Sequence, residues 1–493
     1  MSTVALVSPN LLVQRSDRFT TGIVYMPIGL ASLAATLRGA GHDVRVIDAF
    51  ASAPRQVRRE HGFMVLGLEP AEVAERIPDD AVGVFVYANQ VVNHLAVVSI
   101  LRALRERHPA LPRIVVENTQ AVTAYALEPV AGSLFEAGAD YLLTGEPERR
   151  GLRVVAALAS DRASLAQVDG VLSPSFRNEP AGFDRALDQL PFPAWDLFPV
   201  ESYWRLHFAH GPLTSDRYLP ILTSRGCPYP CRFCVVPKTN RRTWRPRSAT
   251  SVVDEMEHFA RTLGVREFHV EDLNPTIDDR RTRAICREIL DRKLEVTWKI
   301  VAGTKVETLK DEETIDLMAA AGCRYVSISP ESGSARVLDL IEKPFDPGHA
   351  LRLVRRMNEV GIRSQACFVL GFPGETGADL EQTADLARSL TLGGLDEIAL
   401  FVVAPIPGAA IFPELTGYET LSELSFSPSW RADYAALSLF RMKLYRSFLL
   451  LKLLSHPLKI VRQAINFVRR RFETKMEMAP YRALVWTALD SRF

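Results

Sequence analysis

The sequence predicts an α/β protein in which a doubly wound parallel sheet is followed by a TIM-type (β/α) barrel and a helical C-terminal segment. Two observations predict this fold class: β-branched runs alternate with amphipathic patterns from residue 3 to about 150, and again from about 213 to 416. A third is that the remaining residues have a helical and basic pattern. We therefore expect a first domain at 1–155, a linker at 156–212, a barrel at 213–416 and a C-terminal segment at 417–493.

The first series contains short apolar runs separated by helical patterns, as in a parallel sheet covered on both faces. Ligands of such sheets bind beyond the carboxyl ends of the strands. We expect strands at Thr3–Val7, Asp43–Ile47, Ala81–Tyr87, Arg113–Glu117 and Tyr141–Thr144, and helices at Leu30–Gly39 and His94–Arg107. The candidate ligand-binding residues after these strands are Ser8, Asn10, Asn89, Glu117, Asn118, Gly145 and Glu146.

The second series has at least six β/α units, which fits a full or partial TIM-type barrel with its site at the carboxyl ends of the strands. The expected strands are Tyr218–Ser224, Glu267–Glu271, Glu295–Val301, Arg324–Ser329, Ser364–Leu370 and Glu397–Val403.

Three of the six cysteines follow the first barrel strand in a C-x3-C-x2-C motif: Cys227, Cys231 and Cys234. A four-iron cluster normally takes four thiolates, so three leave one iron open for another ligand. A zinc site usually shows a second pair of ligands, and none is present. The other cysteines are interpreted as small apolar core residues: Cys286, Cys323 and Cys367.

The C-x3-C-x-aromatic-C form resembles the signature of radical S-adenosylmethionine (SAM) enzymes. The resemblance implies that the three cysteines hold a [4Fe–4S] cluster and that SAM chelates the open iron. It places Phe233 near the adenine of SAM.

The turns after later barrel strands support the same resemblance. In similar enzymes, residues like Glu271 and Asp272 face the SAM amino group. The run Ser329-Pro330-Glu331-Ser332-Gly333-Ser334 resembles the turn whose glutamate reaches the SAM ribose, although Pro330 departs from the common pattern. In G-F-P-G-E-T, Gly371 and Gly374 would permit close approach to the ligand. The alternative is that each turn simply begins a helix with a capping acid.

The N-terminal segments Pro27–Asp48 and Ala139–Glu148 resemble cobalamin-binding domains fused to radical SAM domains. The D-x-H-x-x-G motif, whose histidine ligates cobalt, is absent, so the resemblance implies cobalamin without that ligand. Relatives often have Gly-Gly where this chain has Glu117-Asn118-Thr119, side chains that would either bond the nucleotide tail or block it. The alternative is a flavodoxin-like domain that has lost its ligand.

Residues 441–475 contain ten basic residues and one acid, and apolar residues recur at helical spacing from Leu458 to Phe472. Such a helix rests on a membrane interface or an acidic partner, or it packs on the barrel and leaves its charges in water. No signal peptide or membrane-spanning run is expected, so we interpret the protein as cytoplasmic, with peripheral membrane contact through this segment.

The resulting hypothesis is a cobalamin-dependent radical SAM enzyme that methylates an unactivated carbon of a small-molecule or lipid-like substrate. A non-methylating rearrangement or cyclisation uses the same cofactors, and no motif separates the two; a cobalamin or redox sensor is a more distant alternative. The cluster requires an external electron donor such as flavodoxin or ferredoxin. The net charge of +1 gives no indication of nucleic-acid binding.

Overall fold

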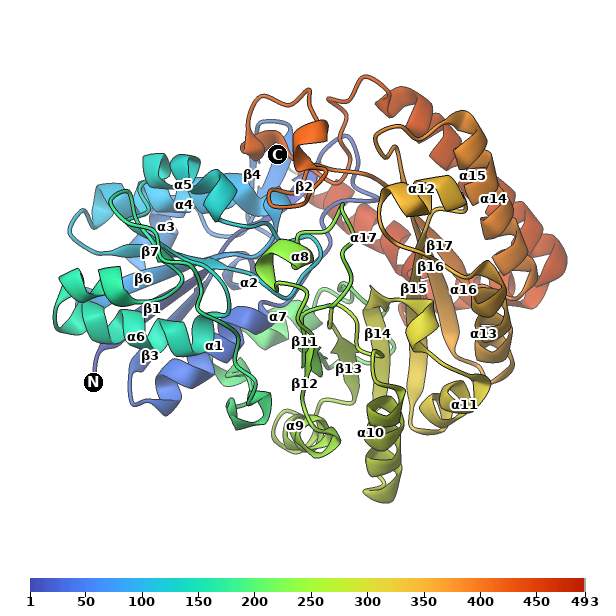
Figure 1. Ribbon diagram of the computed structural model, residues 1–493, viewed down its shortest axis with the longest axis horizontal. Coiled ribbons are helices and arrows are strands. Elements are labelled where there is room, and N and C mark those ends of the chain that lie inside the picture. Colours follow the sequence, from blue (N-terminus) through green and yellow to red (C-terminus); the bar gives the residue numbers. More distant parts are fainter. Residues whose placement is uncertain (492–493) are drawn as a thin grey trace.

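The protein is described by a computed structural model over residues 1–491 (Figure 1). Its N-terminal sheet has the order β3-β1-β6-β7-β8-β9 and is parallel except for β9, which pairs antiparallel with β8. The parallel part follows the 2-1-3-4-5 order of flavodoxin-like sheets, whose switch point lies between the first and third strands. The strands are β1 (Thr3–Ser8), β3 (Asp43–Asp48), β6 (Ala81–Ala88), β7 (Arg113–Glu117), β8 (Tyr141–Leu143) and β9 (Val171–Leu172).

Helices cover both faces of this sheet because successive strand residues point to opposite sides. Val4 and Leu6 pack with α1 (Ile28–Gly39) and α6 (Pro147–Ala159), whereas Ala5 and Val7 pack toward α3, α4 and α5. The bounds of these last three are Pro70–Glu75, His94–Arg107 and Ala131–Ala137. The strands and the two helices predicted here are confirmed to within two residues at each end.

The second sheet has six parallel strands that pair in chain order, β10-β13-β14-β15-β16-β17. It is a partial TIM-type barrel whose edges are β10 and β17. Helices α9 to α14 lie outside it (Figure 1). The strands are β10 (Tyr218–Ile221), β13 (Glu267–Val270), β14 (Thr297–Thr304), β15 (Cys323–Glu331), β16 (Arg363–Leu370) and β17 (Glu397–Val402). The helices are α9 (Ala249–Thr262), α10 (Asp279–Asp291), α11 (Glu312–Ala320), α12 (Ala335–Leu340), α13 (Pro347–Glu359) and α14 (Gly377–Leu392).

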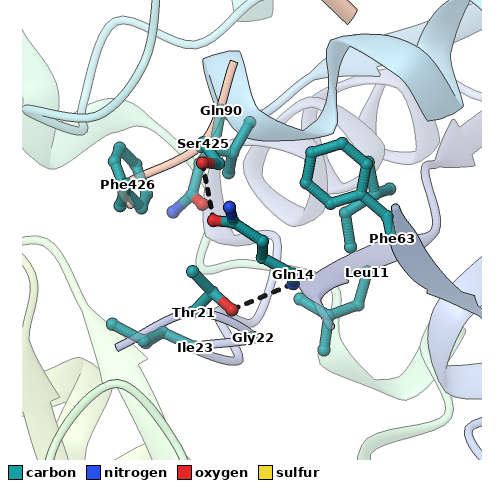
Figure 2. Close-up of a pocket in the computed structure, with 11 residues that line it drawn as sticks. Leu11, Gln14, Thr21, Gly22, Ile23, Phe63, Gln90, Ser425 and Phe426 are labelled. Atoms are coloured by element: carbon teal, nitrogen blue, oxygen red, sulfur yellow. Dashed lines mark hydrogen bonds between the residues drawn. The ribbon is translucent and has the colours of Figure 1, made fainter. Parts of the chain in front are cut away.

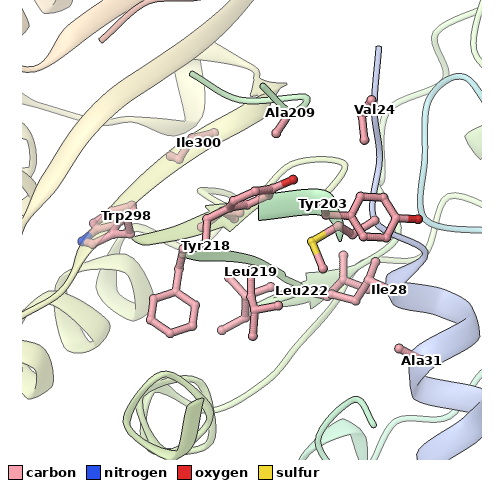
Figure 3. Packing of buried hydrophobic residues seen from close by; sticks show 14 of the residues in the cluster. Val24, Ile28, Ala31, Tyr203, Ala209, Tyr218, Leu219, Leu222, Trp298 and Ile300 are labelled. Atoms are coloured by element: carbon pink, nitrogen blue, oxygen red, sulfur yellow. The ribbon is translucent and has the colours of Figure 1, made fainter. Parts of the chain in front are cut away.

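The two sheets share one apolar core. In Figure 3, Ile28 of α1 lies beside Leu222, which directly follows the first barrel strand, and Tyr203 lies close to both. Trp195, from the proline-rich turn of the predicted linker, is fully buried in this core. The linker region therefore packs the N-terminal sheet against the barrel and fixes their relative position.

A small antiparallel sheet was not predicted. Its strands, in the order β2-β5-β4, are β2 (Leu11–Gln14), β5 (Phe63–Leu66) and β4 (Val57–Glu60). Each strand has four residues, too few to show a period in the sequence. The end of the chain docks beside this sheet, where Asp490 pairs with Arg15, Arg18 and Arg59.

The C-terminal segment forms α15 (Tyr434–Ser455), α16 (Pro457–Arg469) and α17 (Lys475–Asp490). Where α17 begins, the chain passes under the barrel: the Phe472 amide donates to Leu213 (2.6 Å) and the Met476 amide to Glu397 (2.6 Å). Among the described residues, no helix is both long and apolar enough to cross a bilayer.

Two expectations for this segment are wrong. Of the predicted apolar stripe, Phe472 is buried in the core, but the four members on α16 do not pack on the barrel, because that helix buries none of its residues. Four of the ten basic residues do not point into solvent, since they contact other parts of the chain: Arg441, Lys452, Lys459 and Lys475.

Candidate active site

The cysteine motif forms a loop at the carboxyl end of β10, where the barrel architecture places its site. Gly226 begins this loop at φ +79°, and a Cβ there would collide with the Thr243 carbonyl. Asp272, predicted to face SAM, is fully buried and accepts hydrogen bonds from the Thr223 amide (2.7 Å) and the Ser224 hydroxyl (2.5 Å). Its carboxylate thus holds the chain that leads into the loop.

The three thiols of the loop are partly buried and free. Burial raises the pKa of Cys227 to about 11 and that of Cys234 to about 12, so binding of a cluster would have to release protons from these thiols. Within residues 1–491, no three His, Cys, Asp or Glu side chains surround one point as ligands of a single metal ion do. Each thiolate of a cluster binds a separate iron, so this three-thiol donor set fits the predicted [4Fe–4S] cluster.

Glu331 lies opposite the loop, on the last residue of β15. It has φ +64°, a left-handed conformation that costs a non-glycine residue about 1–3 kcal/mol and that the β15–β16 register shift accommodates. Its carboxylate pairs with Lys343, whose ammonium stands 5.7 Å from the centre of the Phe233 ring. Phe233 in turn contacts Phe372 edge to face (5.5 Å). Lys343, which no motif in the sequence indicates, therefore joins Glu331 and Phe233.

The turns after β15 and β16 each contain glycine and complete this side of the site. The Gly371 amide donates to Glu375 (2.5 Å), and the Gly374 carbonyl accepts from Arg336 (2.8 Å). Hydroxyls of other residues cap the following helices: Ser334 caps α12 and Thr376 caps α14. Glu331 therefore does not cap the helix that follows its turn. The alternative, in which this turn simply begins a helix with a capping acid, is wrong for Glu331.

Glu271 faces the barrel mouth from the end of β13. His210 Nδ1 donates to its carboxylate (2.7 Å), and the His210 ring packs at a tilt of 33° against Tyr25 from the N-terminal half (4.4 Å between centroids). Burial lowers the pKa of His210, and the neighbouring Glu271 carboxylate partly opposes this shift. Both protein halves thus position Glu271, predicted to contact the SAM amino group.

The inner surface of the barrel contains polar side chains. Cys367 is not an apolar core residue: its thiol contacts Ser327 Oγ and Gln365 Oε1, both at 3.4 Å, and remains partly exposed, as does Ser329 on the neighbouring strand. Lys475 enters from α17 and donates to the Val301 carbonyl (2.8 Å). Burial lowers its pKa, and the nearby Cys367 partly opposes this shift. A lysine far from the barrel in sequence thus reaches its interior.

The carboxyl edge of the N-terminal sheet lies directly against the cluster loop. Asn240 donates its amide to the Thr119 carbonyl (2.8 Å), and the Ala126 amide donates to Pro407 (2.9 Å). Cys227 and Cys234 pack on the same apolar cluster as the loops that follow β6 and β7. The ligand edge of one sheet and the cysteine loop of the other therefore border one region.

Several residues predicted to bind a ligand at this edge are engaged by the protein itself. The Glu117 carboxylate accepts from the amides of Leu127 (3.0 Å) and Gly145 (2.7 Å), and burial raises its pKa to about 7. Asn118 donates to the Asn89 carbonyl (2.8 Å). The side chains of Glu117 and Asn118 therefore hold the loops after β7 and β8 through hydrogen bonds within the protein.

Glu146 forms an ionic contact between the two halves rather than facing open space. Arg245 donates two hydrogen bonds to its carboxylate (2.6 and 2.8 Å), while Arg225, two residues before Cys227, pairs with Glu148 (2.6 Å). All four charged side chains are buried. The cysteine loop is thereby tied to the turn after β8 and to α6.

Replacing Arg245 by Met should lower the free energy of unfolding by about 3–5 kcal/mol, because Glu146 would lose its bidentate partner in a buried position. The denaturant midpoint of the purified protein measures this loss. Arg241→Met is the matched control: its partner, Glu179, is exposed, so the change should stay within about 1 kcal/mol. Equal midpoints for the two variants would contradict the role of Arg245.

Buried polar atoms without a partner mark the same sheet edge. Among residues 1–491 these include Asn10 Oδ1 after β1, Gln90 Nε2 after β6, Gln120 Oε1 after β7 and Asn240 Oδ1 after the cysteine loop. An unpaired buried polar group costs about 1–3 kcal/mol, so such atoms indicate a missing polar partner. The two that follow β1 and β6 flank the switch point, where sheets of this order bind ligands. A cofactor with amide side arms, as cobalamin has, fits these donors and acceptors.

A small cavity lies near this edge and is lined in part by Gln90 (Figure 2). It lies between β2, β5 and the segment Ser425–Phe426, where Ser425 donates to Gln14 (2.7 Å). Its volume of about 20 Å³ holds little more than one water molecule. It therefore cannot contain a cofactor.

Comparison with known proteins agrees with this geometry. A model of the radical SAM superfamily matches residues 221–387, which span the barrel from β10 to α14. An uncharacterized methyltransferase of Pyrococcus horikoshii is 26% identical over 87% of this chain and 86% of its own length. Cytidylyl-2-hydroxyethylphosphonate methyltransferase of Streptomyces wedmorensis is 27% identical over 83% and 81%.

The fold also matches a solved structure: the radical SAM methyltransferase TsrM from Kitasatospora setae, with cobalamin and a [4Fe–4S] cluster bound. The TM-score is 0.63 at 20% identity, and the match covers 84% of this chain and 74% of TsrM. The cysteine loop and barrel define a radical SAM enzyme. Along most of the chain, the relatives that it resembles are named as methyltransferases.

Proposed function

We propose that the protein is a cobalamin-dependent radical SAM C-methyltransferase acting on a small-molecule or lipid-like substrate. One observation carries this proposal: the ligand edge of the N-terminal sheet and the cysteine loop border the same region, with Cys227 and Cys234 packed against residues from both halves. A methyl donor held at that edge would stand beside the radical source. Relatives named as methyltransferases along most of the chain support it.

The cofactors supply the reactive groups: SAM cleaved at the reduced cluster gives a 5′-deoxyadenosyl radical, and cobalamin carries the methyl group. The residues of this chain bind and orient them. The three thiolates hold the cluster, Glu331 accepts the ribose hydroxyls, and Phe233 borders the adenine. Asn10 and Gln90, which each keep a buried polar atom without a partner, would bind the corrin side arms.

An acidic electron donor such as flavodoxin or ferredoxin suits the surface beside the cluster loop. Arg241 and Arg242 are exposed there, and Arg242 donates to the Pro228 carbonyl within the cysteine motif (3.3 Å). Opposite charge on a partner accelerates association, and the effect falls with salt. Electrons would thus arrive close to the loop that holds the cluster.

Methyl-deuterated SAM tests the reaction. The protein, reconstituted anaerobically with iron, sulfide and hydroxocobalamin, is incubated with reductant, labelled SAM and small-molecule or lipid extracts. We expect deoxyadenosine together with a product that carries the labelled methyl group, and no labelled product when cobalamin is omitted. Deoxyadenosine accompanied by a product without the label would contradict methyl transfer and favour a rearrangement or cyclisation.

A further inference from the structure

Helix α16 has its polar side turned toward the protein. Lys459 pairs with Asp396 (2.9 Å), Gln463 donates to Thr474 (3.1 Å), and Asn466 donates to Glu477 (3.3 Å). Helices on soluble proteins normally bury the apolar side and expose the polar side. In α16 this arrangement is reversed, which leaves its apolar side facing outward.

The outward side of α16 is exposed over the full length of the helix. The side chains of Leu458, Val461, Ile465 and Val468 are 78, 54, 44 and 81% exposed. Their spacing of three or four residues places them along one side. The helix buries no residue at all, so its apolar stripe has no partner within the chain.

The neighbouring helix α15 extends this apolar side. Of the seventeen large hydrophobic residues that are exposed among residues 1–491, ten lie between 439 and 468. We call them the α15–α16 face: Leu439, Met442, Leu449, Leu450, Leu453, Leu454, Leu458, Val461, Ile465 and Val468. Exposed apolar residues that gather in this way mark an interaction site.

The charges around this face have one sign. Residues 434–472 contain no Asp or Glu. Six exposed basic residues lie on the same two helices and just beyond them: Lys443, Arg446, Arg462, Arg469, Arg470 and Arg471. Long basic side chains can lay their stems on apolar surface and reach outward with their charges.

We propose that the α15–α16 face docks on an anionic membrane surface. The apolar side chains would enter the boundary between headgroups and acyl chains while the basic residues contact anionic lipids. A second copy of the chain is a poor occupant, because a two-fold dimer would bring the same six cations together without an acid between them. Contact would be peripheral, since no described helix is long and apolar enough to span a bilayer.

Vesicle flotation of the full-length protein tests this proposal. The protein should float with vesicles of phosphatidylcholine and phosphatidylglycerol, far less with phosphatidylcholine alone, and less as salt rises. Replacing Leu458 and Val468 together by Glu should abolish flotation. Changing Arg469, Arg470 and Arg471 to Gln should weaken binding by about tenfold or more.

Leu290→Glu is the matched control, because Leu290 is an exposed apolar residue on α10, outside this face. It should float like the parent protein, and circular dichroism should show that all variants are folded. Flotation of the Leu458/Val468 variant at the parent level would overturn the proposal. So would a parent protein that ignores anionic vesicles at low salt, or a dimer that the double substitution converts to monomer.

Discussion

Cys231→Ala is expected to abolish the iron–sulfur absorbance and SAM cleavage together. With two thiolates left in the loop, the cluster loses one of its three protein ligands, and nothing nearby replaces it: Cys286 and Cys323 are fully buried in the core, and Cys367 lies within β16. After anaerobic reconstitution, visible spectra report the cluster and chromatography reports deoxyadenosine. We expect deoxyadenosine to fall to the level seen without enzyme.

Cys286→Ala provides the control for this experiment. It also removes a thiol, but from α10, where the side chain only fills the core. The control should keep its cluster and its rate of SAM cleavage, with at most a modest loss of stability from the small cavity. A Cys231→Ala protein that still produced deoxyadenosine at the parent rate would refute the assignment of the loop.

Glu331→Ala should weaken SAM binding by one to two decades, the loss that corresponds to a charged hydrogen bond worth about 1.5–3 kcal/mol. The substitution removes the acceptor for the ribose hydroxyls and leaves Lys343 buried without its partner. Equilibrium dialysis of SAM against the reconstituted variant gives the affinity directly. Iron content, measured on the same sample, should stay at the parent level.

Lys343→Met separates the two possible roles of Glu331. If Glu331 only neutralised the lysine, removing both charges would restore parent affinity in the double variant. Because we expect the carboxylate to contact SAM, Glu331→Ala combined with Lys343→Met should remain weak. SAM affinity at the parent value in Glu331→Ala, or recovered in the double variant, would exclude ribose recognition by this residue.

Helices and strands whose apolar residues recur at a regular spacing in the sequence could be predicted. Arg113–Glu117 and His94–Arg107 form a strand and a helix with the bounds that their apolar patterns indicate. The cysteine motif could also be predicted, because its three ligands lie within eight residues. The strands β2, β4 and β5 could not, since four residues show no period and their pairing joins distant segments.

Contacts between distant segments account for most of the site that was missed. No local pattern indicates that Arg245 reaches Glu146, or that His210 reaches Glu271, because the members of the two pairs lie 99 and 61 residues apart in the sequence. In the sequence, Lys475 lies at the end of a stretch with ten basic residues and one acid. The turn before α17 directs the Lys475 side chain to the Val301 carbonyl of the barrel. Amino-acid composition does not indicate where such a side chain points.

The metal content of one preparation tests the central claim most directly. Protein reconstituted with iron, sulfide and hydroxocobalamin is desalted and analysed for iron and cobalt. The account predicts about four irons per chain, as a [4Fe–4S] cluster requires, together with about one cobalt and no histidine ligand on it. His94, which follows β6, is buried against Tyr125 (3.1 Å) and is not free to serve. Iron without retained cobalt, or spectra with imidazole on cobalt, would contradict a cobalamin site of the proposed kind beside the cluster.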